Sequence, residues 1–341
     1  MSLWLERSIT GYFQLFGLVC GWSGSRLGRL LGSSFLLVIL IELATEIGGY
    51  FKDSIPDDGP LASYFVKTIQ GVNVAYKMVH AWIVIMALLQ CRRNRCLLEQ
   101  LPLVGSTSFA YRHLILELLL VGCALVLVFL DYSKGGEYLT TLQYSFSLQA
   151  VRARYLQMML LVDRLDGQLE QLHHRVISGT IDYKTLRSDY AQLAKLSRSL
   201  SNLFGLSLLL MNILCLGDWI IVCNVYFMVE YLEALPASWF IFCQAMFVVL
   251  PTLGKIWTMC AACHRCVAKS KHLQEQLKDR PGQTPLERSH IEGFALQIMQ
   301  DPIQFDVCGI YHLNLQTLAG MFFFILEALV IFLQFVSFVR T

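Results

Sequence analysis

The sequence is poor in charged residues and lacks the signals of a soluble or glycosylated secreted domain. Only 15% of its 341 residues are Asp, Glu, Lys or Arg, whereas 55% are hydrophobic. An average soluble domain has roughly 25% charged residues, so this composition excludes a soluble globular protein. No Asn-x-Ser/Thr acceptor site occurs, and a net charge of +2 is too small to indicate nucleic-acid binding.

Motifs for catalysis and cofactor binding are also absent. The sequence has no phosphate-binding Gly-rich loop, no His-Glu-x-x-His and no Gly-x-Ser-x-Gly. We therefore expect no enzyme activity, no catalytic residue and no cofactor. The 11 cysteines are scattered through apolar runs, which indicates free thiols rather than a disulfide framework. Cys260, Cys263 and Cys266 lie beside basic residues, so inert thiols or palmitoylation sites are the alternatives, and we expect no metal site.

Long apolar runs dominate the sequence instead. A membrane helix needs about 20 consecutive apolar residues. Seven segments satisfy this length: Leu31–Gly49, Val66–Gln90, Leu114–Leu130, Tyr138–Val162, Leu203–Val229, Trp239–Ala262 and Leu313–Val339. The sequence therefore predicts an all-α polytopic membrane protein, with a single seven-helix membrane domain over residues 1–341.

Charges in the connecting loops predict the orientation of these helices. The connection after the second segment contains Arg92, Arg93 and Arg95, and those after the fourth and sixth are also rich in Lys and Arg. The intervening connections are acidic or neutral, with residues such as Asp57 and Glu230. The positive-inside rule then places the N-terminus in the cytoplasm and the C-terminus outside. G-protein-coupled receptors have the opposite orientation.

Two long basic connections have the apolar periodicity of helices. Leucines recur at helical spacing through residues 163–202, and a similar pattern occupies parts of residues 264–312. We interpret both ranges as cytoplasmic helical segments that extend the membrane helices. They form a plausible surface for contacts between subunits.

Charged residues inside the apolar segments require partners or water, because ionisable groups are costly at membrane depth. Glu42 and Lys77 both lie near the middle of a predicted span, and we expect them to form an ion pair. This pair is either a structural link within the bundle or part of a ligand sensor. Arg152, Arg154 and Glu117 lie in the inner halves of their segments. They form either a structural pair or side chains that reach the cytoplasmic interface.

The outer halves of the segments are rich in aromatic and polar side chains, including Asp218. A subset that points inward would form a pocket with aromatic walls and a few hydrogen-bonding groups, which suits a small organic ligand. Interfacial belt positions or simple packing are the alternative. The pocket candidates are Asn73, Tyr76, Tyr132, Tyr144, Trp219, Asn224, Trp239 and Gln244.

The last segment carries two polar groups on one face. Glu327 and Gln334 are separated by about two helical turns, so both side chains project in the same direction. A membrane helix with polar groups on one face usually lines a wet space or meets a partner.

Particular residues of the chain resemble the insect gustatory receptor family. Its signature is Thr-Tyr, five hydrophobic residues and Gln-Phe, and here Leu329 to Leu333 precede Gln334 and Phe335. The stretches Phe305–Asn314 and Tyr12–Leu18 also resemble the family. The chain departs from the signature where Glu327 and Ala328 replace Thr-Tyr.

The resemblance implies a gustatory receptor in the plasma membrane of a sensory neuron. It implies a ligand-gated, non-selective cation channel with one central pore, formed by four identical or related subunits. Its partners would be a small-molecule tastant, permeant cations and membrane lipid. A membrane transporter or carrier is the alternative. For Glu327 there are two alternatives: its carboxylate would face the pore, or it would form a hydrogen bond to a neighbouring helix. The segment 313–339 is the candidate pore helix, with the pore-lining candidates Phe324, Glu327, Ile331, Gln334 and Phe335.

Overall fold

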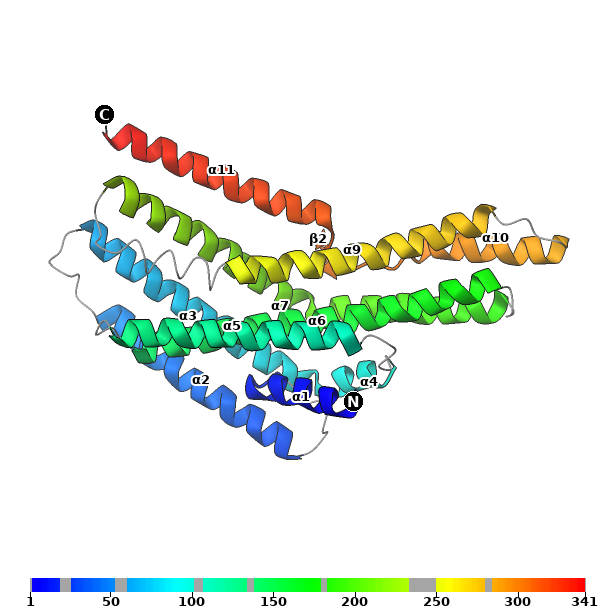
Figure 1. Ribbon diagram of the computed structural model, residues 1–341, viewed down its shortest axis with the longest axis horizontal. Helices are drawn as coiled ribbons and strands as arrows, with labels where there is room; N and C mark the ends of the chain where they lie inside the picture. Colours follow the sequence, from blue (N-terminus) through cyan, green and yellow to red (C-terminus); the bar gives the residue numbers. More distant parts are fainter. Residues whose placement is uncertain are drawn as a thin grey trace.

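A computed structural model describes residues 2–18, 26–52, 60–100, 107–133, 138–178, 183–232, 250–279 and 284–340. These residues are almost entirely helical, and the helices lie roughly side by side in an elongated bundle (Figure 1). The elements are α1 (Ser2–Leu15), α2 (Arg26–Lys52), α3 (Pro60–Leu89), α4 (Cys91–Gln100), α5 (Thr107–Ser133), α6 (Tyr138–Ser178), α7 (Tyr183–Leu232), α9 (Leu250–Asp279), α10 (Pro285–Gln300), β1 (Asp306–Val307), β2 (Tyr311–His312) and α11 (Leu315–Arg340).

The all-α membrane fold expected from the sequence is confirmed, since each predicted span coincides with a long helix: α2, α3, α5, α6, α7, α9 and α11. Residues 239–249, with which the sixth span begins, lie outside the described residues. Within the described part, three helices are long and apolar enough to cross a membrane by composition alone, in the windows Gly32–Gly49, Gln70–Leu89 and Tyr183–Val222. The others contain more polar residues or shorter apolar stretches, such as Leu315–Ile331.

Helix α6 lies at the centre of the bundle. This position explains why composition alone does not identify it as a membrane span. It packs against α3, α5, α7 and α9, and every side chain from residue 147 to 162 is buried. Its polar residues therefore face other helices rather than lipid. A helix in this position needs internal partners for its charges instead of a uniformly apolar surface.

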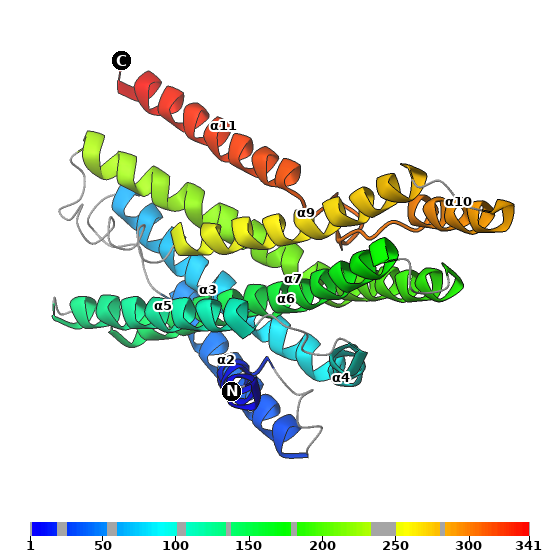
Figure 2. The same cartoon turned by 45° about the vertical axis from the view of Figure 1, so that its right-hand side comes forward.

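The ends of α6, α7 and α9 continue beyond the predicted spans and, with α10, form an elongated layer at one end of the molecule (Figures 1 and 2). Helix α10 begins at Pro285, because Thr284 caps it by accepting a hydrogen bond from the Glu287 amide at 3.1 Å. Pro285 occupies its first turn, where a missing amide N–H costs little.

A two-stranded hairpin within residues 264–312 corrects the expectation that this range is helical. Strands β1 and β2 pair antiparallel, with Val307 opposite Tyr311. Cys308 and Gly309 have φ values of 54° and 70°, which a tight hairpin turn requires and a helix excludes. The hairpin lies against α7 at Gly205, where an added Cβ would come within 3.2 Å of the Cys308 backbone nitrogen.

The structure also distinguishes between the two interpretations of the cysteines on α9. Cys260, Cys263 and Cys266 are each no more than 1% exposed. Burial raises the pKa of the Cys266 thiol, which disfavours the reactive thiolate. Their burial favours the interpretation as packing residues over palmitoylation, which requires an accessible thiol. Among the described residues, no cluster of His, Cys, Asp or Glu is arranged to hold a metal ion.

Candidate functional site

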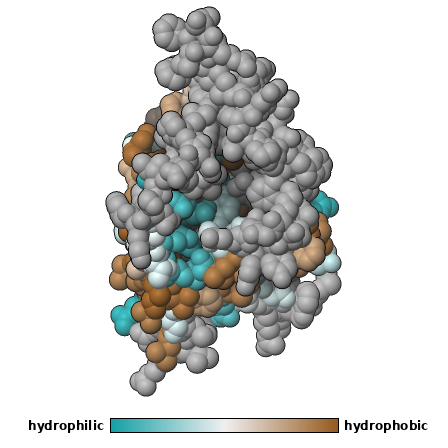
Figure 3. All heavy atoms as spheres, turned by 90° about the vertical axis from the view of Figure 1, so that its left-hand side faces the viewer, coloured by the Kyte–Doolittle hydropathy of each residue, from teal (hydrophilic) through white to brown (hydrophobic). Residues whose placement is uncertain are grey.

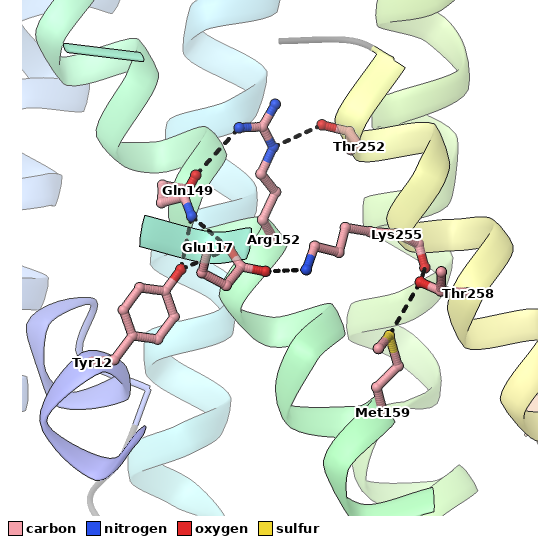
Figure 4. A network of polar contacts seen from close by, with 8 residues as sticks. All are labelled: Tyr12, Glu117, Gln149, Arg152, Met159, Thr252, Lys255 and Thr258. Atoms are coloured by element: carbon pink, nitrogen blue, oxygen red, sulfur yellow. Dashed lines mark hydrogen bonds and ion pairs between the residues drawn. The ribbon is translucent and has the colours of Figure 1, made fainter. Parts of the chain in front are cut away.

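A buried polar network joins four helices around the carboxylate of Glu117 on α5 (Figure 4). One of its oxygens accepts hydrogen bonds from the Tyr12 hydroxyl at 2.9 Å and from the Gln149 amide at 2.7 Å. The carboxylate also forms an ion pair with Lys255 of α9. Glu117 and Lys255 are 0% and 2% exposed, so each charge depends on the other for compensation.

The same network contains Arg152 of α6. Its guanidinium donates to the Thr252 hydroxyl on α9 at 3.0 Å and to the Gln149 carbonyl oxygen at 3.3 Å. Arg152 and Arg154 are both fully buried, but the ion pair that the structure gives Glu117 is with Lys255. Arg154 lies 4.0 Å from the centre of the Phe204 ring.

Sequence reasoning missed Lys255, although a signal for it was present. It is a single lysine inside the sixth predicted span, and such residues usually face a partner. The periodic apolar residues around it gave no indication of which helix supplies that partner. Its pairing with Glu117 depends on how α5 and α9 flank α6.

A second polar cluster lies closer to the predicted outer end and contains two of the pocket candidates. The hydroxyls of Tyr76 on α3 and Tyr144 on α6 donate to the same Asp218 oxygen, at 2.9 and 3.3 Å. The two rings meet edge to face with their centres 5.2 Å apart. The cluster therefore combines aromatic rings with one acidic group, the types of side chain expected at a site for a small polar organic molecule.

The remaining pocket candidates are not all brought to this cluster. Asn73 and Trp219 are partly buried, and Trp219 packs against the main core. Tyr132 and Asn224 belong to α5 and α7, but their side chains lie outside the described set. Trp239 and Gln244 lie outside the described residues. Figure 3 shows the end of the molecule that lies on the left in Figure 1. Hydrophilic side chains gather in a hollow near the centre of this face.

The expected ion pair of Lys77 forms with a different carboxylate. Lys77 donates to Glu46 at 2.5 Å and to the Gln143 side chain at 2.8 Å. The predicted partner Glu42 is therefore wrong by one helical turn of α2. The register in which α2 packs on α3 places Glu46, and not Glu42, beside Lys77. This register cannot be predicted from the depth of each residue along its span.

Exchanging the charges of Lys77 and Glu46 tests this pairing. Lys77→Glu and Glu46→Lys should each lower surface expression, because each leaves a like-charge pair where Lys77 is fully buried. The double variant should restore expression, measured by surface biotinylation. Lys77→Glu with Glu42→Lys is the matched control and should give no rescue. Rescue by the control alone would contradict the observed pairing.

A chain of hydrogen bonds leads from the middle of the bundle to the hairpin before α11. The Tyr155 hydroxyl donates to the Asn212 carbonyl oxygen at 2.5 Å, and the Asn212 amide donates to the Tyr311 hydroxyl at 2.6 Å. Burial raises the pKa of Tyr311 to about 12, so its hydroxyl stays protonated at neutral pH.

Helix α11 lies along the edge of the bundle (Figures 1 and 2) and packs on α7 and α9. Leu318 and Ile325, at 3% and 4% exposure, form its inner face. The candidate pore stripe lies on the other side: Phe324 and Ile331 are each 58% exposed, and Glu327 and Gln334 are exposed as well. The Phe335 side chain lies outside the described set.

Comparisons with known proteins agree with this architecture. The family model described as 7tm chemosensory receptor matches residues 6–338. The chain is 74% identical over its full 341 residues to the whole of a Drosophila melanogaster protein named "Putative gustatory receptor 9a". Its fold is similar to that of the olfactory receptor OR5 of Machilis hrabei in complex with eugenol, with a TM-score of 0.70, 11% identity and 98% of each chain covered. The OR5 structure described without a ligand gives a TM-score of 0.69 at 12% identity, again over 98% of each chain.

Proposed function

Since the chain belongs to the 7tm chemosensory receptor family, we propose that it is a gustatory receptor that acts as a ligand-gated, non-selective cation channel. It is a receptor and not an enzyme. The proposal adds to this family membership a tetrameric assembly, a central pore lined by α11 and a tastant site in the outer half of each subunit. Sensory-neuron plasma membrane is the proposed location.

The observation that carries the channel proposal is the exposed polar stripe on α11. Phe324, Glu327 and Ile331 face away from the subunit that contains them, and the described residues offer the Glu327 carboxylate no hydrogen bond or ion pair. A carboxylate facing lipid at this depth would be costly. The alternative was that Glu327 bonds to a neighbouring helix, and no described residue of the same chain makes this bond. In a symmetric assembly, water and cations in the pore would surround the carboxylate.

The tastant site is proposed at the cluster of Tyr76, Tyr144 and Asp218. Support comes from the convergence of polar groups from α3, α6 and α7 at this point. Figure 3 shows that hydrophilic side chains also gather near the centre of the face at this end of the molecule. The olfactory receptor of similar fold binds eugenol, a small phenol. A ligand that moves Tyr76 or Tyr144 would break their hydrogen bonds to Asp218 on α7, the helix against which α11 packs.

Cysteine substitution on the two faces of α11 tests the pore assignment. Ile331→Cys should react with a water-soluble methanethiosulfonate reagent, and the reaction should irreversibly alter currents evoked by a panel of sugars, alkaloids and phenols. Ile325→Cys is the matched control on the buried face and should stay unaffected. The parent chain is treated in parallel because Cys96 and Cys308 are exposed.

The same recordings separate a channel from a transporter. A channel gives ligand-evoked current with unitary steps and a reversal potential set by the cations alone. If the tastant itself is taken up in a fixed ratio to an ion, and the current has no unitary steps, the protein is a carrier and the channel proposal is wrong.

A further inference from the structure

A cavity of about 430 Å³ lies between α9, the linker after α10 and the start of α11. Its floor is apolar and well packed, formed by residues that include Ile303, Phe305 and Leu313, each no more than 2% exposed. Its walls are polar and carry His264, Lys271 and His312. The site therefore combines a hydrophobic base with cationic and amide groups at its rim.

The charge on this rim is positive. None of the described residues that line the cavity is an aspartate or glutamate. Lys271 is exposed and forms no ion pair with a described residue. Lys269, two residues earlier on α9, is by contrast paired with Asp166 and Glu170. His312 is paired through Nδ1 with Asp306, so Lys271 is a rim cation to which the described residues give no counter-charge.

The position along α9 and α11 places this cavity near a membrane boundary. The predicted spans end at Ala262 on α9 and begin at Leu313 on α11, and both of these ends are cytoplasmic in the proposed orientation. A rim at this level lies among the lipid headgroups of the cytoplasmic leaflet, whose anionic lipids attract Lys and Arg near the surface.

We propose that this cavity binds the phosphate of an anionic lipid headgroup from the cytoplasmic leaflet. Lys271 and His264 take the phosphate oxygens, the neighbouring amide side chains bond to the polar headgroup, and the glycerol lies on the apolar floor. Because the hairpin and the start of α11 form one wall, the bound lipid holds the base of that helix. The binding step depends on the proposed orientation but requires no channel activity.

Binding to the purified full-length protein tests the proposal. Dioctanoyl phosphatidylinositol 4-phosphate should bind and raise the unfolding temperature, whereas dioctanoyl phosphatidylcholine should not. Lys271→Gln should weaken binding about tenfold, the effect of losing one charge-assisted hydrogen bond. Lys195→Gln on α7 is the matched control, since Lys195 is also exposed but does not line the cavity. His264→Gln gives an independent second variant.

Each outcome decides the matter. A selective loss of lipid affinity in Lys271→Gln or His264→Gln, with unchanged unfolding of the lipid-free protein, supports the site. Equal affinity for inorganic phosphate or inositol 1,4-bisphosphate identifies a free phosphate compound and overturns the lipid proposal. Equal losses in the cavity variants and Lys195→Gln show non-specific attraction and also overturn it. An absence of tastant-evoked current would challenge the channel proposal without affecting these measurements.

Discussion

Replacing Lys255 with methionine should remove most of the folded receptor from the cell surface. The substitution leaves the Glu117 carboxylate buried without its cation, and breaking a buried ion pair in this way costs about 3–5 kcal/mol. Domains are commonly stable by only about 5–15 kcal/mol. Surface biotinylation should therefore fall close to background, and the unfolding temperature of the purified protein should drop sharply.

Helix α9 provides its own control for this prediction. Lys269 also forms ion pairs, but its side chain is 38% exposed, so Lys269→Met should cost no more than about 1 kcal/mol. Adding Glu117→Gln to Lys255→Met should recover part of the expression, because it removes the orphaned charge. Equal losses in Lys255→Met and Lys269→Met would show that burial of the Glu117 pair does not determine stability.

Replacing Glu327 with glutamine should lower divalent permeability and relieve divalent block while leaving a tastant-evoked monovalent current. If four carboxylates face one pore, their attraction is twice as large for a divalent ion as for a monovalent ion at the same distance, about 2 against 1 kcal/mol per carboxylate at 4 Å in water. Reversal potentials in mixed calcium and sodium solutions measure this change. The shift should be largest at low ionic strength, where screening is weakest.

Glu327→Asp separates charge from side-chain shape at this position. The shorter carboxylate keeps the ring of charge, so its calcium permeability should stay close to that of the parent receptor. Unchanged divalent permeability and block in Glu327→Gln would place the carboxylate away from the permeation path. A loss of all current in both variants, with normal surface expression, would instead indicate a role in gating.

The helices were predictable because hydropathy and loop charge are properties of consecutive residues, which the sequence shows directly. The position of α3, for example, follows from its apolar length. The partner of its Lys77 does not, because both Glu42 and Glu46 lie on α2 at a suitable depth and only the packing register distinguishes them. Tyr76 and Tyr144 were recognisable as pocket candidates by type, but their convergence on Asp218 depends on three helices.

The hairpin before α11 was missed for a related reason. Its strands contain two residues each, too few for a strand periodicity to be read. Its conformation depends on the turn at Cys308 and on the space above Gly205 of α7, far away in the sequence. Local turn chemistry at Gly309 was a usable signal, but the docking surface was not.

The burial of Arg152 in the bundle centre also has a consequence for synthesis. Its partner Thr252 follows 100 residues later in the chain, so at roughly 5–20 residues per second the ribosome supplies that partner about 5–20 s after Arg152. Releasing α6 into lipid during this interval would cost roughly 2.5–3.5 kcal/mol for each arginine at the bilayer centre. The insertion machinery is therefore expected to retain α6 until α9 emerges, so the central helix of the finished receptor is among the last to leave the translocon.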